Sequence, residues 1–252
     1  MSFELNTIFN EDCLTGMNDI PDHSVDLILV DPPYGTTRCK WDTIIPFDEM
    51  WRHYNRIAKD NAAILIFGTE PFSSTLRISN IKYFRYDWIW KKTIGTGNMN
   101  ANKMPLKKHE IISVFYKKLP TYNPQFFSGT PYTDNRAYGN NDRREEELYG
   151  SYVEHNKPII NSGTRYPTSV IEFSNPNHNR LHKTEKPLEL IEFFIKTYSN
   201  EGDVVLDNCM GSGTTAVGCI DLNRRFIGYE KDETIYNIAV NRANEAKHGT
   251  IR

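Results

Sequence analysis

The chain has 252 residues, of which 38% are apolar, enough for one large α/β core or a core with a small appendage. Its formal net charge of -2 excludes a uniformly basic protein that coats DNA, although it allows a local cationic face. The four cysteines form no CxxC pair and have no His at zinc-ligand spacing, which favours reduced thiols and no metal. The sequence shows no signal peptide and no apolar stretch of membrane-spanning length, so we expect a cytoplasmic protein.

Short apolar runs alternate with amphipathic segments along the chain, a pattern typical of an α/β sheet. Runs such as LILV and ILIF lack polar alternation and suit central parallel strands, whereas YDWIW and IISVFY suit a neighbouring pair near an edge. The predicted strands are residues 7–10, 26–30, 62–67, 86–90, 111–116, 203–207 and 225–230. The predicted helices are residues 45–60, 186–199 and 214–223. The pattern therefore predicts a doubly wound, mostly parallel α/β sheet of seven strands.

The character of the chain changes in residues 119–180, which are rich in Tyr, Asn, Gly and Arg and show little helical or strand periodicity. A segment of this length is too long for an idle loop in a compact domain. Its Tyr and Phe content favours a recognition insertion over a disordered segment. We therefore predict one domain in two halves, residues 1–118 and 181–252, interrupted by an insertion at 119–180.

The stretch DVVLDNCMGSGTTAVG (203–218) combines a strand, an acid at its end, a glycine turn and a helix start. Gly211 and Gly213 allow the backbone to pass close to a ligand, and the helix N-terminus presents N–H groups. The next strand ends in Glu230, whose carboxylate suits the hydroxyls of a ribose. Because Asp207 lies where a phosphate would bind and GK[ST] is absent, we expect a positively charged nucleoside cofactor without phosphate.

A second motif, DPPY, follows the apolar run LILV and comprises Asp31, Pro32, Pro33 and Tyr34. Alone, it is compatible with an ordinary turn, since Asp and Pro are common in turns. Together with DNCMGSGTT, it resembles the DNA amino-methyltransferases that use S-adenosylmethionine, and the order of the motifs resembles their β group. The resemblance covers nearly all of the chain outside the insertion. It implies a circularly permuted class I methyltransferase fold with 119–180 as target-recognition region.

The resemblance also implies which residues hold S-adenosylmethionine, whose product is S-adenosylhomocysteine. Asp12 and Cys13 would lie beside the adenine, Glu230 at the ribose, and Asp207, Gly211, Ser212, Gly213 and Thr214 around the methionine portion. His182, Thr184, Lys186 and Pro187 match the HxTxKP element that lines the same pocket, and Asp31, Asn208 and Lys231 complete the expected set. The family usually has DPF in the glycine motif, so Asn208 and Cys209 depart from it and put the aromatic contact of that Phe in doubt.

The chemistry implied for DPPY is direct methyl transfer to an exocyclic amino group. Such a nitrogen is a poor nucleophile because its lone pair is conjugated with the ring, and acceptors aimed at its N–H groups favour the charge that develops during transfer. The Asp31 carboxylate and the Pro32 carbonyl are such acceptors, with Pro33 stiffening the loop and Tyr34 stacking on a flipped base. We therefore expect site-specific methylation of adenine N6 in double-stranded DNA.

DNA contacts are expected from residues 91–110, which have five lysines and one acid, and from the insertion. The candidate residues are Lys91, Lys92, Lys103, Lys107, Lys108, Arg136 and Arg165, with Arg143, Arg144 and Arg180 as further candidates. A simple solvated loop is the alternative for residues 91–110.

Three other functions remain open at this point. Cytosine N4 is the nearest, because related enzymes act on it, although DPPY is the usual adenine form and SPPY the commoner cytosine form. RNA or protein N-methylation is less favoured, since in those families the glycine motif normally comes first and Asn commonly replaces Asp. Intact Asp31, Asp207 and Glu230 argue against a catalytically inactive DNA-binding module. The β group often forms dimers and serves restriction–modification, so a homodimer and a partner nuclease also stay open.

Overall fold

The computed structural model describes residues 4–37, 39, 42–134, 159–175 and 185–249. The chain divides into two compact units, one of residues 1–123 with 169–252 and the other of residues 124–168. The second unit lies within the insertion expected at 119–180. The two units are described separately below.

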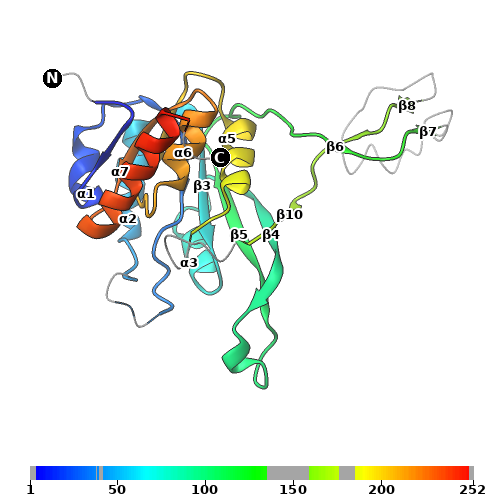
Figure 1. Ribbon diagram of the computed structural model, residues 1–252, viewed down its shortest axis with the longest axis horizontal. Coiled ribbons are helices and arrows are strands. Elements are labelled where there is room, and N and C mark those ends of the chain that lie inside the picture. The colour runs from blue at the N-terminus through cyan, green and yellow to red at the C-terminus, as the bar shows by residue number, and fades with distance from the viewer. Residues whose placement is uncertain (1–3, 38, 40–41, 135–158, 176–184, 250–252) are drawn as a thin grey trace. The chain divides into compact units, whose positions relative to one another are not determined.

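The larger unit is built on a sheet to which the described residues contribute eight strands (Figure 1). In spatial order they are β1 (Thr7–Phe9), β12 (Arg225–Tyr229), β11 (Val204–Asp207), β2 (Val25–Val30), β3 (Ala58–Gly68), β5 (Lys107–Phe115), β4 (Phe84–Thr96) and β10 (Val170–Phe173). The first five strands in this order are parallel neighbours, and β5 runs antiparallel to both β3 and β4. The predicted mostly parallel sheet is therefore confirmed.

The strands β2 and β11 are adjacent and parallel although 170-odd residues separate them in sequence, with Val205 opposite Leu27 and Leu206 opposite Ile28. This neighbourhood agrees with the circularly permuted fold that the order of the motifs implied. Because parallel strands end at the same edge, the residues that follow both strands lie together.

Helices cover both faces of the sheet. The described helices are α1 (Cys13–Gly16), η1 (Met17–Asp19), α2 (Phe47–Ile57), α3 (Phe72–Ser79), η2 (Asn98–Asn100), α5 (Leu188–Tyr198), α6 (Thr214–Asp221) and α7 (Glu233–Lys247). None of the helices in the described part of the chain is both long and apolar enough to cross a membrane.

The central strand β2 shows why two cores form. Successive side chains of a strand point to opposite faces, so Leu27 and Leu29 enter the core beneath α5, α6 and α7, whereas Ile28 and Val30 enter the core beneath α1, α2 and α3. All four side chains are at most 1% exposed. Each such burial contributes about 1.5–3 kcal/mol, which fixes the strand at the centre of the sheet and with it the position of the loop that follows.

Several elements of the larger unit were not predicted from the sequence, among them one strand and two helices that pack on the main sheet. The strand β10 comes from residues assigned to the insertion and pairs in parallel with β4 at the edge of the main sheet. The helices α3 and α7 also went unassigned. A capping signal marks α7, because the Asp232 side chain accepts a hydrogen bond from the backbone N–H of Ile235 at 3.0 Å.

The described residues of the smaller unit, 124–134 and 159–168, form two short antiparallel pairs. In one, β6 (Phe127–Ser128) pairs with β9 (Thr164–Arg165), and in the other, β7 (Tyr132–Asp134) pairs with β8 (Ile159–Asn161). Their short length accounts for the weak strand periodicity of this part of the sequence.

Candidate active site

The ends of β2 and β11 open into a cavity of about 590 Å³ within the larger unit. Asp31 follows β2 and Asp207 ends β11, and both side chains line this cavity. Pro32, Pro33 and Tyr34 line it as well. The structure thus brings the two sequence motifs together at one edge of the sheet.

The DPPY loop folds back on itself at its first residue. The Tyr34 hydroxyl donates a hydrogen bond to Oδ1 of Asp31, and the Tyr34 ring packs on Phe72 with 5.1 Å between ring centroids. Burial raises the pKa of the Tyr34 hydroxyl, so it remains a neutral donor. The aromatic side chain is consequently held at the cavity wall next to the carboxylate.

A buried carboxylate downstream anchors the loop that leaves the motif. Asp42 accepts hydrogen bonds from the backbone N–H groups of Gly35 at 2.8 Å, Thr36 at 2.9 Å and Thr37 at 2.6 Å. Burial opposes the charge of Asp42, but these donors outweigh it and lower its pKa. Asp42 therefore ties residues 35–37 into a fixed turn behind the DPPY motif.

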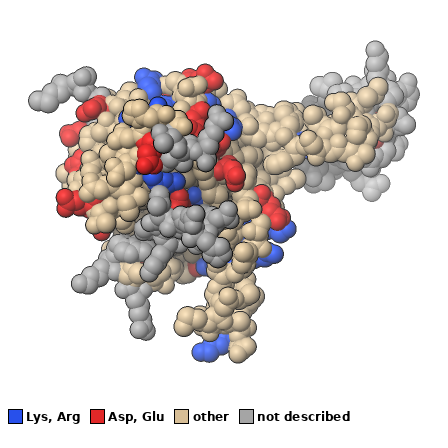
Figure 2. All heavy atoms as spheres, in the orientation of Figure 1, with Lys and Arg blue, Asp and Glu red and all other residues tan. Residues whose placement is uncertain are grey.

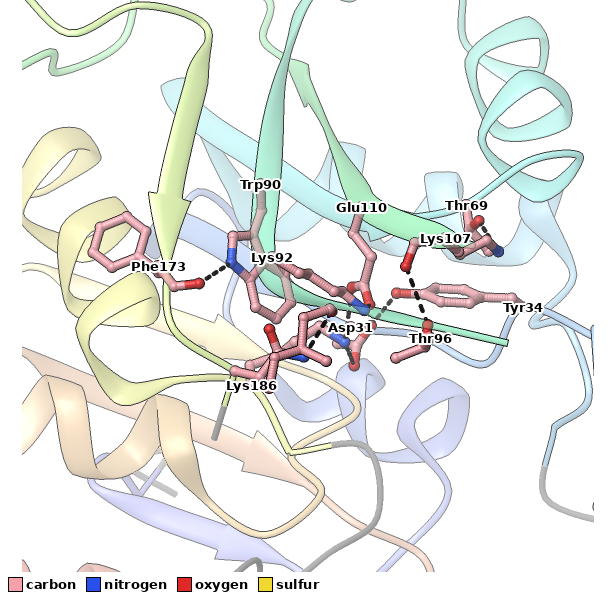
Figure 3. A network of polar contacts seen from close by, with 12 residues as sticks. Asp31, Tyr34, Thr69, Trp90, Lys92, Thr96, Lys107, Glu110, Phe173 and Lys186 are labelled. Carbon is pink, nitrogen blue, oxygen red and sulfur yellow. Dashed lines mark hydrogen bonds and ion pairs between the residues drawn. The ribbon is translucent and has the colours of Figure 1, made fainter. Parts of the chain in front are cut away.

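Three charged side chains form a chain of ion pairs that ends on Asp31 (Figure 3). Lys186, just before α5, donates to Oδ2 of Asp31, and its Nζ lies 3.3 Å from Oε2 of Glu110 on β5. Lys92 on β4 donates to Oε1 of Glu110 at 2.5 Å. Three separate segments therefore deliver two cations and one further carboxylate to the catalytic motif.

The charges in this network stabilise one another. Burial raises the pKa of Asp31, and the Lys186 ammonium opposes that rise. Burial also acts against the charge of Glu110, but Lys186 and Lys92 outweigh it and hold the pKa of Glu110 below its ordinary value. Asp31 and Glu110 likewise outweigh burial at Lys186 and raise its pKa. Removing one member of a buried ion pair costs about 3–5 kcal/mol, so the network is a fixed part of the site.

Asp207, at the end of β11 before the glycine turn, has different surroundings from Asp31. Asp207 is 4% exposed, and its oxygens accept from the Thr215 hydroxyl at 2.6 Å and the Cys209 N–H at 3.0 Å. Both donors are neutral, and burial raises the pKa of Asp207 to about 7. A positively charged group in the cavity would stabilise the ionised form.

The two glycines of the turn have different structural roles. Gly211 has φ +54, and a Cβ there would meet nothing closer than the Cys209 carbonyl at 4.0 Å, so the backbone is open to a ligand. Gly213 has φ +87, and a Cβ there would lie 3.0 Å from Cα of Ala239 on α7. Gly213 is absent from the cavity wall and serves the packing of α7 instead of the ligand side.

Glu230 is held in place at the cavity wall by backbone donors. Its Oε2 accepts from the N–H of Gly211 at 3.0 Å and its Oε1 from the N–H of Asp232 at 2.9 Å. Asp12 accepts from the N–H of Leu14 at 2.9 Å and caps α1. Together with Lys231, both carboxylates line the cavity at the side where the resemblance implies the adenosine.

Asn208 couples the turn to the helix α2. Its Oδ1 accepts from the Tyr54 hydroxyl at 2.5 Å, and its amide lies 3.4 Å from Sγ of Cys13. The residue is 2% exposed and borders the cavity, and its contacts with Tyr54 and Cys13 stabilise the turn. On the other side, Arg242 donates to the carbonyl and hydroxyl of Ser212, both at 2.9 Å, and pairs with Glu185 at 2.8 Å.

These residues fit a nucleoside with a cationic tail. The backbone at Gly211 is open, so a ligand can approach it closely. The carboxylate of Glu230 can accept hydrogen bonds from ribose hydroxyls. Asp207, whose hydrogen-bond donors are both neutral, can provide the negative charge opposite a cationic group. In the ranges that the structure describes, no group of three or more His, Cys, Asp or Glu is placed to hold a metal ion.

Some predicted residues lie elsewhere. Pro187 is the N-cap of α5 and is absent from the cavity wall, whereas Lys186 reaches the cavity through the ion pair with Asp31. His182, Thr184 and Arg136, with Arg143, Arg144 and Arg180, fall outside the described residues.

The expected DNA-contacting lysines divide into two groups. Lys92 is 8% exposed and committed to Glu110, a placement that does not suit contact with a phosphate. Lys103 and Lys108 are exposed, Lys91 forms a surface ion pair with Glu172 at 2.6 Å, and Lys107 donates to the Thr69 hydroxyl at 2.5 Å. Figure 2 shows basic and uncharged side chains towards the end of the β4–β5 hairpin, whereas charges of both signs intermingle on the main body.

In the smaller unit, Arg165 is engaged locally. Its guanidinium donates to Oδ1 of Asn161 at 2.5 Å and lies 4.6 Å from the centroid of the Tyr132 ring. This guanidinium is therefore held in one orientation within the unit.

Three residues of the site were missed from the sequence: Glu110, Asp42 and Arg242. For the inward position of Lys92, the partner of Glu110, a signal existed, because Trp88, Trp90 and Lys92 are buried at every second position of β4 and therefore share its inner face. Lys92 thus continues an apolar stripe and does not belong to a basic surface. Asp42 binds backbone groups five to seven residues before it, and Arg242 binds Ser212 thirty residues before it; neither contact leaves a recognisable pattern in the sequence.

Comparison with known proteins agrees with this geometry. A sequence model of the DNA methylase family, covering N6 and N4 enzymes, matches residues 25–241. The Type II methyltransferase M1.MboII of Moraxella bovis is 30% identical over 94% of this chain and 95% of its own.

Solved structures share the fold. The M1.HpyAVI–SAM complex aligns with a TM-score of 0.66 at 22% identity, over 94% of this chain and 98% of that one. The cytosine-N4-specific PvuII DNA methyltransferase also aligns with a TM-score of 0.66, at 15% identity, over 96% of this chain and 93% of that one. The class I methyltransferase fold is thereby confirmed, and S-adenosylmethionine is the cofactor that this family uses. The chain belongs to the N6/N4 DNA amino-methyltransferase family.

Proposed function

We propose that this enzyme transfers a methyl group from S-adenosylmethionine to N6 of adenine in a specific sequence of double-stranded DNA, acting on a base flipped out of the duplex. One observation carries the proposal: Asp31 and Asp207, at the ends of adjacent parallel strands, face the same cavity. The first would receive the amino group of the base and the second the charged end of the cofactor.

When bound, S-adenosylmethionine supplies an electrophilic methyl group on a sulfonium centre. Asp31 and the Pro32 carbonyl would accept hydrogen bonds from the amino group of the base and orient its lone pair toward the methyl carbon. The amino nitrogen would take this methyl group, the electrons of the broken C–S bond would stay on sulfur, and the proton that the nitrogen releases would pass to solvent. Tyr34 would stack on the base, and its hydroxyl bond to Asp31 keeps the carboxylate oriented before substrate arrives.

On the cofactor side, Glu230 would accept from the ribose hydroxyls and Asp207 would face the ammonium of the methionine portion. Gly211 would let the main chain pass close to the ligand. Lys103 and Lys108 on the β4–β5 hairpin would contact phosphates, which position the duplex without reading its sequence. The insertion at 119–180 would read the bases.

Adenine is favoured over cytosine by the acid at the first position of DPPY. The fold does not separate the two bases, because an enzyme described as cytosine-N4-specific aligns over 96% of this chain. Cytosine N4 therefore remains the second candidate.

Digesting DNA methylated by the purified enzyme to nucleosides, and separating the products by mass, tests the base directly. We expect N6-methyladenine; N4-methylcytosine alone would replace adenine by cytosine and leave the rest of the mechanism standing. The Asp31→Ala variant, processed in parallel, controls for methylation carried over from the expression host. Single-molecule sequencing of the same DNA would report the recognition sequence.

A further inference from the structure

Lys186 lies where the resemblance implies a cofactor contact, yet its ammonium faces the catalytic motif. It donates to Oδ2 of Asp31, lies 3.3 Å from Oε2 of Glu110, and its Nζ is 5.2 Å from the centroid of the Phe67 ring. The side chain is only 9% exposed. Its ion-pair partners among the described residues are the carboxylates of Asp31 and Glu110. Both are close enough to hold the ammonium between them.

We infer that Lys186 is a positioning residue for methyl transfer: it fixes the Asp31 carboxylate in its charged form and orientation, while Glu110 and Lys92 fix Lys186. The inference rests on the proposed function, in which Asp31 receives the amino group of the base. It assigns to Lys92 on β4, Glu110 on β5 and Lys186 before α5, which all border the cavity, a part in catalysis that acts through Asp31.

The geometry explains why two carboxylates need two cations here. Asp31 and Glu110 face the same ammonium, and alone they would share a single positive charge in a buried place. Lys92 adds the second, at 2.5 Å from Glu110 and at 5.0 Å from the centroid of the Trp90 ring. The four groups sum to zero net charge, so each carboxylate has a cation beside it and each cation a carboxylate.

The ionisation of Asp31 also depends on its other neighbours. Tyr34 on the same loop donates to it, Glu110 on β5 and Asp207 on β11 are carboxylates near it, and Lys186 is its cation. Burial raises the pKa of Asp31, Lys186 lowers it and Glu110 raises it. Replacing Lys186 should therefore move the pKa of Asp31 up, and neutralising Glu110 should move it down.

The test uses Lys186→Met, Lys186→Arg and Glu110→Gln in the full chain, with Lys196→Met as matched control. Lys196 lies on α5, 42% exposed, in an i,i+4 ion pair with Glu192 at 3.1 Å. Single-turnover methyl transfer across pH, S-adenosylmethionine affinity by calorimetry and carboxyl NMR titration of Asp31, assigned with Asp31→Asn, are measured on each variant.

For Lys186→Met we expect transfer at neutral pH to fall by about 100-fold, with the acid limb of the pH profile moved up and cofactor affinity kept within about threefold. For Glu110→Gln the acid limb moves down. Lys186→Arg keeps the limb in place because it keeps the cation, and Lys196→Met changes nothing. The NMR titration of Asp31 follows the same directions in each variant.

Weakened cofactor binding in Lys186→Met with an unmoved acid limb would overturn the inference and return Lys186 to the cofactor site. Shifts in the same direction for Lys186→Met and Glu110→Gln would overturn it too, because mere loss of structure does not distinguish the sign of the removed charge. If Lys186→Met does not fold, Lys186→Arg and Glu110→Gln carry the test. If wild type methylates no DNA while the NMR shifts appear as expected, the proposed function fails and the role of Lys186 at Asp31 stands.

Discussion

The edge of the sheet presents two aspartates at the ends of adjacent strands, in opposite electrostatic surroundings. Asp31 after β2 is paired with the Lys186 ammonium, whereas Asp207 at the end of β11 is met by a hydroxyl and a backbone N–H. Burial raises the pKa of both, but among the described residues a cation opposes the rise at Asp31 and none does at Asp207. Within this part of the chain, the first site has its own counter-charge and suits a neutral amino group, whereas the second has none and suits a charged ligand.

Removing the paired carboxylate should give the largest effect. We expect Asp31→Ala to lower methyl transfer by about 1000-fold or more, since it removes the acceptor for the amino group, while cofactor affinity is largely kept. Incorporation of labelled methyl groups into DNA and calorimetry with S-adenosylmethionine measure the two quantities. Asp60→Asn is the control, because Asp60 is half-exposed in a surface pair with Lys118. Near-wild-type transfer by Asp31→Ala would contradict the mechanism.

Filling the cavity at the other site should abolish cofactor binding. Gly211→Trp places an indole in the space that the backbone leaves open, so calorimetry should detect no binding. Gly211→Ala is the matched control, since it imposes the same cost of φ +54, about 1–2 kcal/mol, without filling the cavity. Equal affinity in the Trp variant and wild type would remove the glycine turn from the cofactor site.

Neutralising Asp207, the carboxylate without a cation beside it in the described part of the chain, should weaken cofactor binding less than Gly211→Trp does. Asp207→Asn removes the counter-charge for the ammonium and should raise the dissociation constant by about 10- to 100-fold. In wild type, Asp207 has a pKa of about 7, and a bound cation favours its ionised form. Below pH 7 the carboxyl of free Asp207 is protonated and must release its proton when the cationic cofactor binds. The affinity for the cofactor should therefore fall by about tenfold for each unit by which the pH is lowered below 7. Calorimetry across pH measures the slope, which should vanish in Asp207→Asn; an unchanged slope would place the titration elsewhere.

Replacing lysines outside the Asp31 and Asp207 sites should alter DNA affinity and leave methyl transfer chemistry and cofactor binding unchanged. Lys103→Gln combined with Lys108→Gln should lower affinity several-fold and reduce the dependence of log affinity on log salt by about 1 per lost phosphate contact. Fluorescence anisotropy at several salt concentrations measures this, with Lys247→Gln at the end of α7 as control. An identical salt slope would take the hairpin out of the DNA interface.

The sequence predicted the sheet well because its central strands are uninterrupted apolar runs, and β2 and β11 carry recognisable motifs at their ends. It also predicted Asp31, Asp207, Gly211 and Glu230 at one edge, since parallel strands end together. It did not predict the partners of these groups. Glu110 reaches Asp31 only through a sheet register and a lysine far along the chain, and such tertiary pairing leaves no local periodicity.

Local sequence patterns gave a different interpretation from the structure for one lysine and one glycine. The basic stretch 91–110 suggested phosphate contacts throughout, yet strand alternation turns Lys92 inward and leaves Lys103 and Lys108 outside. Gly213 resembled a ligand-side glycine but accommodates Ala239 of α7. In both cases the residue type was read without the neighbour that packs on it.

The position of β11 has a consequence for how the enzyme is made. This strand lies in the interior of the sheet between β12 and β2, but it is synthesised after both β2 and the β4–β5 hairpin. During synthesis the growing chain therefore exposes the apolar flank of β2 until residues beyond 200 emerge, and pairing across so large a sequence separation is slow. Because the counter-charge site for the cofactor arrives with the same strand, sheet closure and catalytic competence are acquired in one late step.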